Sequence, residues 1–352
     1  MPYHQGFELC TEIMKNTHAN QIQFPHIVGI DISKMSIDVA VIETPSMKSN
    51  SAVFSNDSEG FQKMKKWIKQ LGNDCNENIL FCMEHTGIYT RNIVKYLLKR
   101  GCKVWLESSL HIKRSMGLVR GKSDKIDAER IAKFAFDHQR DAKLVKLSHP
   151  TLNRLKDLMK TRMRLQKGLQ SQTVAINELV RVDPKAGREI ERISRQAVEG
   201  LKKSLVKVEE KMEELVNIDK QLRALYQLVT SVKSVGKVLA IDLIVYTDGF
   251  TRMLDNRKLA CYCGVAPFEY RSGTSVFSNP GTSSFANKQL KHHLHMCAMN
   301  AIKCHKELRD YYLRKTEDGK SKMSALNAVR NKLLHRVVAV VKRGTPYMEK
   351  LD

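Results

Sequence analysis

The chain has 352 residues, of which 42% are hydrophobic, and it carries a formal net charge of +23 at pH 7. This length leaves room for two domains with separate cores, and the positive excess favours a polyanionic partner. No apolar run reaches the ~18 residues of a membrane span, and the N-terminus lacks the basic-then-apolar pattern of a secretory signal. We therefore expect a cytoplasmic protein that has no membrane partner.

The N-terminal part of the chain predicts an α/β domain. Residues 1–25 show no sustained period and are interpreted as an N-terminal extension, and the domain itself is expected over residues 26–147. Its order is three strands, helix, strand, helix, strand and further helices, a meander followed by βαβ crossovers, which predicts a mixed sheet with helices on its faces. The expected strands lie at 27–32, around 37–41, and at 51–55, 78–84 and 102–107, and the expected helices at 58–72 and 87–101 and around 121–134.

Residues 148–230 change to a helical pattern, with apolar residues spaced by threes and fours between Lys and Glu. The segment "RVDPKAGRE" (181–189) interrupts this pattern with Pro and Gly. Two long helices are predicted, which form either an antiparallel hairpin within the chain or a coiled-coil arm that pairs with another protomer.

The last domain is expected over residues 231–346, followed by a short tail at 347–352, and it is predicted to be mainly helical. It holds 20 Lys+Arg against 8 Asp+Glu, a net charge of +12 and about half of the total excess. "SVKSVGKVLAIDLIVY" (231–246) resembles a helix-hairpin-helix element, which presents backbone N–H groups to a phosphate. Lys233 and Lys237 are its candidate nucleic-acid ligands, although the turn keeps only one glycine, Gly236.

Metal binding by cysteine and histidine is not expected. None of the eight cysteines forms a CxxC pair, and several lie in apolar runs, where Cys behaves as a small hydrophobe. The His- and Cys-rich segment 291–305 spreads these residues around much of a helix, so they do not converge on one ion.

Four carboxylates stand out instead. Asp31 lies inside the apolar first strand, where an acid is costly unless it is paired or bound to metal, and Glu84 ends the apolar fourth strand. Asp124 and Asp127 fall on the helix face that continues into Ile131 and Phe134, so they point inward. If the first and fourth strands are neighbours, a helix packed over them brings all four acids together.

Four acids so close repel one another and need cations to neutralise them. Oxygen-preferring Mg²⁺ or Mn²⁺ suits that need, and two such ions about 4 Å apart can hold both oxygens of an in-line phosphoryl displacement. The cationic residues around the second acid pair are candidates for a phosphate backbone: Lys113, Arg114, Arg120 and Lys122.

A second candidate lies in the tract 263–285, which is rich in Gly, Ser, Thr and Pro and reads as loops. Ser272 follows Arg271, which is a further candidate nucleic-acid ligand, and an adjacent cation together with a metal-bound phosphate could activate a serine as a nucleophile. The residues alone give no reason to prefer Ser272 over the neighbouring serines at 275, 278, 283 and 284.

These motifs resemble a known family. "GIDISK", "MEHTGIY" and "GKSDKIDAERIA" look like the DEDD motif of bacterial insertion-sequence transposases with a RuvC-like catalytic domain, the insertion-sequence 110 group, which includes the Piv invertase. "SVKSVGKVLA" and "LACYCGVAPFEYRSGTS" look like the second transposase domain of the same family, and the motifs keep the family's order from about residue 26 to 346.

The resemblance implies a ribonuclease H-like domain, a coiled-coil arm and a helical serine-bearing domain. It implies metal binding by Asp31, Glu84, Asp124 and Asp127, and attack of Ser272 on a DNA phosphodiester through a phosphoserine link. It further implies a composite site in a dimer or tetramer, donor and target DNA, and an element-encoded guide RNA whose pairing reads sequence while the protein reads backbone shape.

Two other readings stay open at this stage. A RuvC-like nuclease would hydrolyse branched DNA with metals alone and leave Ser272 without a catalytic role. A nucleic-acid-binding architectural protein would bind DNA and cleave none. An ATPase of the actin and sugar-kinase type is disfavoured because no Gly-rich phosphate loop follows the first strand.

Overall fold

The computed structural model describes residues 24–43, 48–72, 78–85, 87–115, 124–146, 149–272 and 276–348, and of residues 124, 125, 270–272 and 276–280 it describes the backbone only. The chain divides into two compact units, residues 1–147 and 148–352, and each is considered by itself. None of the helices in the described ranges has an apolar stretch long enough to cross a bilayer.

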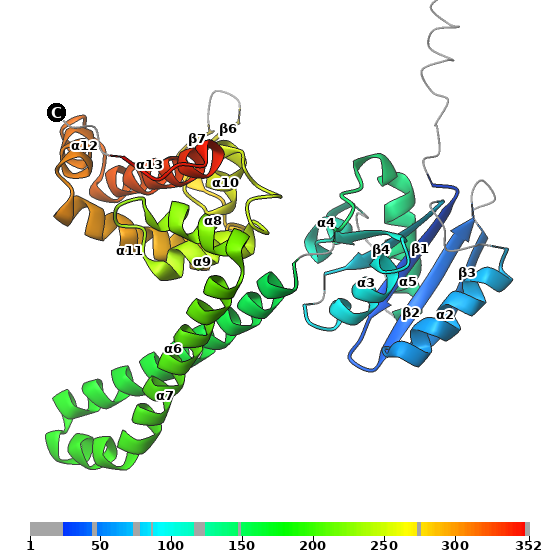
Figure 1. Ribbon diagram of the computed structural model, residues 1–352, viewed down its shortest axis with the longest axis horizontal. Coiled ribbons are helices and arrows are strands. Elements are labelled where there is room, and N and C mark those ends of the chain that lie inside the picture. The colour runs from blue at the N-terminus through cyan, green and yellow to red at the C-terminus, as the bar shows by residue number, and fades with distance from the viewer. Residues whose placement is uncertain are drawn as a thin grey trace, which may run out of the picture. The chain divides into compact units, whose positions relative to one another are not determined.

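The first unit is built on a five-stranded mixed sheet (Figure 1). Its strands are β1 (His26–Ile32), β2 (Ser36–Glu43), β3 (Lys48–Ser55), β4 (Ile79–Glu84) and β5 (Lys103–Glu107). The order is β3-β2-β1-β4-β5, with β2 antiparallel to its two neighbours and β1, β4 and β5 parallel. This arrangement confirms the predicted mixed sheet and the neighbouring positions of its first and fourth strands.

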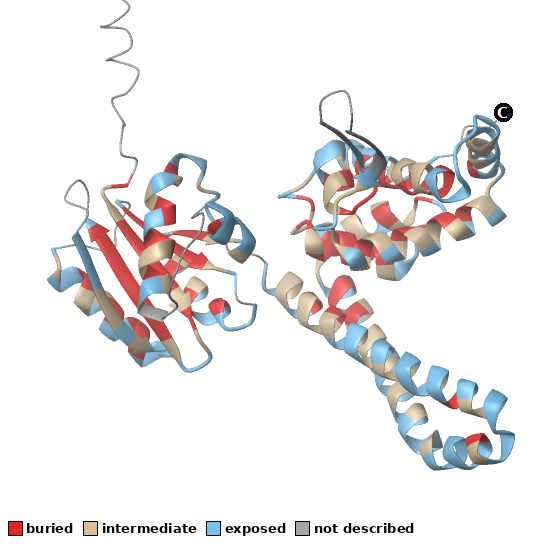
Figure 2. Ribbon diagram, turned by 180° about the vertical axis from the view of Figure 1, so that it is seen from behind, coloured by how far each residue is buried: buried red, intermediate tan, exposed pale blue. Residues whose placement is uncertain are grey.

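Helices cover both faces of this sheet. They are α2 (Ser58–Gln70), α3 (Thr90–Leu98), α4 (Ser109–Ser115) and α5 (Asp124–Asp137), followed by the short 3-10 helix η1 (Gln139–Asp141). Alternate residues of β1 enter different cores: Val28 and Ile30 pack with residues of α2 and α3, whereas Ile27 packs with residues of α5. Burial on both faces explains why β1, β2 and β4 are mostly apolar, whereas the edge strand β3 is largely exposed, and Figure 2 shows the buried residues concentrated along the sheet.

The second unit begins with a pair of long helices, α6 (Pro150–Val182) and α7 (Pro184–Ile218). They pack against each other within the chain, and Arg162 Nε lies 2.7 Å from Glu209 Oε1 across the pair. The predicted break is a single residue, Asp183, whose side chain accepts hydrogen bonds from the first backbone N–H groups of α7. The rest of the predicted second helix is separate: α8 (Lys220–Thr230) starts anew after Asp219, which caps it in the same way.

The remainder of the second unit is mainly helical, as predicted. Its helices are α9 (Lys237–Tyr246), α10 (Asn256–Tyr262), α11 (Lys288–Cys304), α12 (Lys306–Glu317) and α13 (Lys322–Arg343). Residues 239–245 of α9 are all buried, so this helix forms the centre of a core to which α8, α11 and α13 also contribute.

The expectation of loops over residues 263–285 is wrong for part of that tract. β6 (Pro267–Ser272) and β7 (Val276–Thr282) form an antiparallel hairpin. Its sequence is rich in turn-forming residues, but Phe268 and Tyr270 alternate with polar residues in β6, and such alternation suits a two-stranded ribbon.

Candidate active site

Gly29 sets how closely α5 approaches the sheet. A Cβ built on Gly29 would lie 2.3 Å from the carbonyl oxygen of Ala128 and 2.3 Å from the backbone nitrogen of Ala132. The helix backbone therefore rests directly on β1, which only a glycine permits. The face of α5 that packs on the sheet carries small and apolar side chains. The predicted inward-facing stripe is confirmed, since Ile131 and Phe134 are 3% and 2% exposed.

The direction of α5 follows from a contact at its other end. The backbone N–H of Phe24, just before β1, donates to Gln139 Oε1 at 2.9 Å, just after α5. The helix thus runs antiparallel to β1, and its N-terminal turn points toward the end of the strand that carries Asp31. From the contact at Gly29, Asp31 is about 7 Å along the strand, and Asp124 is about 6 Å along the helix from Ala128.

Asp31 and Glu84 lie side by side at this edge of the sheet. The parallel register pairs Ile30 with Met83, and the next step places Asp31 beside Glu84, the last residue of β4. Both side chains are half-buried and project from the α5-covered face, because they are two residues beyond Gly29 and Cys82. Asp31 Oδ1 accepts a hydrogen bond from the backbone N–H of Ile32 at 3.0 Å.

The acids on α5 are described unequally. Asp127 is half-buried, with a side chain that is 29% exposed and 2.8 Å from Arg130 Nη1. Asp124 is the first residue of α5, but its side chain lies outside the described atoms. Among the described side chains, no three of Asp, Glu, His and Cys form a ready-made metal site, so the four-acid cluster stays a prediction.

Sequence reasoning missed two further acids in the same place. The registers pair Asp31 with Asp38 on β2 and Glu84 with Glu107 on β5, so one row of carboxylates crosses four adjacent strands on one face. We call Asp38, Asp31, Glu84 and Glu107 the carboxylate row. Asp38 could have been found from the alternation of β2, which puts it on the face opposite to Val39 and Val41.

The two outer members of the carboxylate row differ from the inner pair. Asp38 is only 8% exposed. Glu107 is tied to its own strand end, since it accepts from Trp105 Nε1 at 3.2 Å and from the backbone N–H of Ser108 at 2.8 Å. The inner pair, half-buried at adjacent strand ends, is therefore the better candidate for metal binding.

The donor set fits a hard divalent cation. Carboxylates on adjacent strands are about 5 Å apart, and two negative charges so placed at a partly buried edge repel unless a cation lies between them. Only oxygen donors are present in the carboxylate row, which is the chemistry that Mg²⁺ and Mn²⁺ prefer over softer metals.

The predicted nucleophile lies in the other unit. Ser272 is the last residue of β6, paired with Val276 at the end of the hairpin, and its side chain and that of Arg271 are outside the described atoms. The hairpin is anchored at its other end, where Lys291 Nζ donates to Thr282 Oγ1 at 2.7 Å.

The expected nucleic-acid ligands fall into three groups. Lys113 and Arg114 are exposed in the last turn of α4, and Arg120 and Lys122 lie outside the described residues. Lys233 is exposed, whereas Lys237 Nζ lies 2.5 Å from Glu213 Oε1, and this hydrogen bond raises the pKa of Lys237.

The turn of the helix-hairpin-helix-like element keeps its shape without its first glycine. Ser234 occupies that position with φ 66°, in the left-handed region that favours glycine, and Gly236 caps the next helix, α9. Asn300 Nδ2 donates to Ser234 Oγ at 3.3 Å and holds it there. Ser234 thus adopts in this turn a backbone conformation that favours glycine.

The histidines around residue 293 serve separate contacts. His293 Nδ1 lies 2.5 Å from Oδ2 of Asp242, a carboxylate that is 1% exposed in the centre of α9. His295 Nδ1 lies 2.5 Å from Arg330 Nη2, and burial together with Arg330 lowers the pKa of His295. In the part of the chain that the structure describes, these residues stabilise helix packing and do not converge on an ion.

Comparison with known proteins gives two matching family models in the order of the chain. A model for the DEDD transposase of IS110 elements matches residues 28–182, and one for the transposase IS116/IS110/IS902 family matches residues 226–313. The first match contains Asp31, Glu84 and α5, and the second contains Ser272.

Individual similar proteins match either most of the chain or a part of it. The pilin gene-inverting protein of Moraxella bovis is 23% identical over 337 residues, 92% of this chain and 98% of that protein. The insertion element IS110 uncharacterized 43.6 kDa protein of Streptomyces coelicolor is 28% identical over 157 residues, 44% of this chain and 38% of that protein. RuvC of T. thermophilus in complex with a Holliday junction substrate is 12% identical and covers 34% of this chain and 99% of its own, with a TM-score of 0.25.

Proposed function

The chain belongs to the IS110 family of DEDD transposases and is related to the pilin gene-inverting protein, and we propose that it cuts and rejoins DNA with a metal-binding acid site and the Ser272 nucleophile. The observation that carries the proposal is the edge of the sheet where Asp31 lies beside Glu84 and to which the N-terminal turn of α5 points. Asp124 and Asp127 are on that turn, which supports a site shared by acids from β1, β4 and α5.

Asp31, Glu84, Asp124 and Asp127 would hold one or two Mg²⁺ or Mn²⁺ ions. When bound, such ions neutralise the charge that builds up on a phosphodiester under attack. The protein's own contribution is to fix the acids: strand register sets the spacing of Asp31 and Glu84, and the contact at Gly29 sets the height of α5 above them.

Ser272 would supply the covalent step. Its Oγ attacks the phosphorus, the Ser Oγ–P bond forms, and the bond from phosphorus to the departing deoxyribose oxygen breaks, with that oxygen leaving as a hydroxyl. A deoxyribose hydroxyl of the second DNA then attacks the phosphoserine, which joins the strands and restores the serine. The ester keeps the energy of the broken bond, so strand exchange needs no external energy source, unlike hydrolysis.

Several partners follow from the same proposal. Two DNA segments are required because a strand is transferred between them, and an element-encoded guide RNA would choose them by base pairing. A homo-oligomer would bring acids and serine together from different protomers. Exposed apolar residues near the tip of the α6–α7 pair support association there, namely Val182, Ile190 and Ile193, of which the first is 85% exposed.

The test separates the recombinase from a hydrolytic nuclease and from an architectural DNA-binding protein. Strand exchange, strand cleavage and covalent protein–DNA adducts are measured with Mg²⁺ for the wild type, Ser272→Ala and Asp31→Asn. The recombinase loses all three activities in both variants. Cleavage that persists in Ser272→Ala while Asp31→Asn loses it would establish the nuclease, and DNA binding without cleavage by the wild type would establish the architectural protein.

A further inference from the structure

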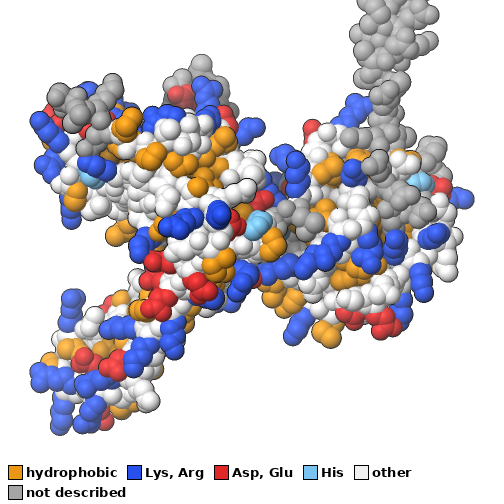
Figure 3. Space-filling model, in the orientation of Figure 1, with side chains coloured by type: hydrophobic (Ala, Val, Ile, Leu, Met, Phe, Trp, Pro, Cys, Tyr) orange, Lys and Arg blue, Asp and Glu red, His pale blue; other side chains and the backbone are white. Residues whose placement is uncertain are grey.

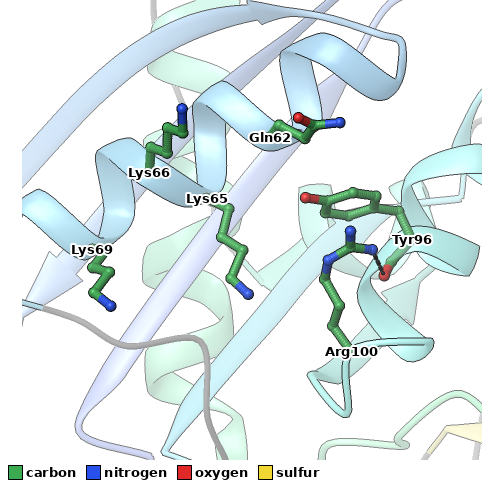
Figure 4. A pocket seen from close by; sticks show the side chains of 6 residues that line it. All are labelled: Gln62, Lys65, Lys66, Lys69, Tyr96 and Arg100. Carbon is green, nitrogen blue, oxygen red and sulfur yellow. Dashed lines mark hydrogen bonds between the residues drawn. The ribbon is translucent and has the colours of Figure 1, made fainter.

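A basic hollow lies on the first unit between α2 and α3, on the sheet face opposite to the carboxylate row. It is a shallow, open depression of about 450 Å³, and Figure 4 shows the six side chains that line it. We call it the α2–α3 hollow, and its lining is Gln62, Lys65, Lys66, Lys69, Tyr96 and Arg100. Lys and Arg side chains gather over these two helices in Figure 3.

Among the described residues, no carboxylate lines this hollow to balance its four cations. Glu59 is the only acid of α2, and it lies one turn before Lys63, with which it pairs at 2.7 Å. The sequence of α3 has no acid at all. Within the described residues, the three lysines of α2 therefore face one another, Arg100 and neutral groups.

This arrangement costs stability in the isolated protein. Lys65 and Lys69 are four positions apart, and Lys66 and Lys69 are three, so both pairs are neighbours of like charge on the helix surface. Each such pair of like charges destabilises a helix. A helix face that only had to be soluble would gain by mixing in acids, so the unmixed charge points to an anionic ligand.

Arg100 is held in position for such a ligand. Its guanidinium carbon lies 3.6 Å from the centre of the Tyr96 ring, and Nη1 donates to the backbone carbonyl of Tyr96 at 3.3 Å. Tyr96 in turn packs on the buried Phe61 with ring centres 5.4 Å apart. A guanidinium fixed in this way loses little freedom when its remaining N–H groups bind a phosphate.

The ring contacts also indicate the form of the nucleic acid. Arg100 lies over one side of the Tyr96 ring and Phe61 packs against the same ring, so Tyr96 is engaged by both. Proteins that bind single strands stack bases on open aromatic faces, and the lining, as far as the structure describes it, offers no other aromatic residue for this purpose. Cations without a stacking platform suit the phosphates of a duplex.

We propose that the α2–α3 hollow is a second nucleic-acid site, which binds the phosphate backbone of duplex DNA on the face of the sheet opposite to the acids. The inference rests on the proposed function in that the duplex is taken to be DNA. A recombinase has to hold DNA beyond the phosphodiester under attack, and a site on the opposite face contacts a part of the substrate that the acids do not reach.

The test measures binding of the full chain to a 40-base-pair duplex DNA over a range of KCl concentrations. Lys65→Gln/Lys66→Gln/Lys69→Gln removes three charges from the hollow. Each lost phosphate contact makes the negative slope of log K against log [salt] shallower by about 0.9. This change weakens binding about fivefold at 0.15 M salt. A loss of two to three contacts is expected, with a melting temperature equal to or above that of the wild type because the like-charge pairs are gone.

The matched control removes the same charge from another helix. Lys202→Gln/Lys203→Gln/Lys207→Gln takes three exposed lysines from α7. This control should keep the wild-type slope; an equal loss in both variants would assign the effect to net charge and overturn the proposal. Arg100→Lys keeps the positive charge and removes the planar guanidinium with its several N–H donors. This variant should bind duplex DNA more weakly with little change in the salt slope.

Two further measurements distinguish a DNA ligand from an RNA ligand, and DNA binding by the hollow from DNA cleavage by the acid site. If the hollow variant loses binding to duplex RNA of the same length and keeps its binding to duplex DNA, the proposal is wrong and the hollow is an RNA site. Asp31→Asn, which should abolish cleavage, should keep the full salt slope. An unchanged salt slope in the lysine variant would thus refute the proposed site in the hollow. Absence of DNA cleavage by the wild type would instead refute the proposed function.

Discussion

Gly29→Ala should disable the acid site from a position that has no functional group of its own. The new Cβ would lie 2.3 Å from Ala128 O and from Ala132 N, and both are backbone atoms of α5 that cannot rotate away. An ordinary contact is about 3.4 Å or more, so α5 has to lift by about 1 Å. Overpacking of this kind costs about 1–3 kcal/mol in unfolding free energy.

The effect on catalysis should exceed the effect on folding. Lifting α5 moves Asp124 and Asp127 away from Asp31 and Glu84, and a misplacement of about 1 Å in a reacting site can cost about 100-fold in rate. We expect a melting temperature lower by about 4–8 °C for a loss of 2 kcal/mol, and Mg²⁺-dependent strand exchange slower by about 100-fold at a temperature where the variant is fully folded.

Two controls define this prediction. Gly200→Ala in the middle of α7 introduces a Cβ with no heavy atom within 4 Å, so it should stabilise the protein by about 0.5–1 kcal/mol. Gly29→Ala/Ala132→Gly should not recover activity, because the clash is with backbone atoms and not with the Ala132 side chain. A Gly29→Ala protein with the wild-type melting temperature and rate would refute the reasoning.

Three other predictions concern the second unit. Ser234→Gly should raise the unfolding free energy by about 1 kcal/mol, because φ 66° is strained for serine, and unchanged denaturant midpoints would contradict this. His293→Ala should cost about 3 kcal/mol in thermal unfolding by leaving the buried Asp242 carboxylate with the Gln289 amide as its remaining side-chain donor, whereas a loss below 1 kcal/mol would show that the contact with His293 is not needed. Hydrogen bonds from Lys332 and, second, from Arg336 lower the pKa of Glu307. The stability that they contribute is therefore present above the unfolded-state pKa and is lost as the pH falls through the folded-state pKa. Glu307→Gln should make unfolding stability less dependent on pH in the acid range, and an unchanged pH dependence would argue against this.

The sheet and the position of α5 were predictable because burial leaves a periodic signature. The order of apolar strands and helices along the chain predicts a meander followed by crossovers. Because crossovers between parallel strands are right-handed, few strand orders are then possible for the sheet. The inward face of α5 could be read from Ile131 and Phe134 because a helix repeats every 3.6 residues. The family resemblance, which rests on short motifs around the acids, agrees with both family models.

Features that depend on register or on local capping were harder to predict. The carboxylate row exists because Asp38 faces Asp31 across a hairpin, and a shift of one residue would have turned Asp38 to the other face. The break between α7 and α8 is set by the Asp219 side chain and leaves the apolar spacing intact, so periodicity could not show it. The β6–β7 hairpin was missed because turn-rich composition was given more weight than alternation.

The central claim is that acids from β1, β4 and α5 share one metal site, and iron-directed backbone cleavage tests it most directly. Fe²⁺ replaces Mg²⁺ at such sites, and with ascorbate and peroxide it generates radicals that cut the polypeptide only within a few ångströms of the ion. We expect fragments that end near Asp31, near Glu84 and between Asp124 and Asp127. All of them should be lost together when Mg²⁺ competes or when Asp31→Asn is introduced. Cleavage at only one of these three segments, or cuts that persist in Asp31→Asn, would contradict the shared site.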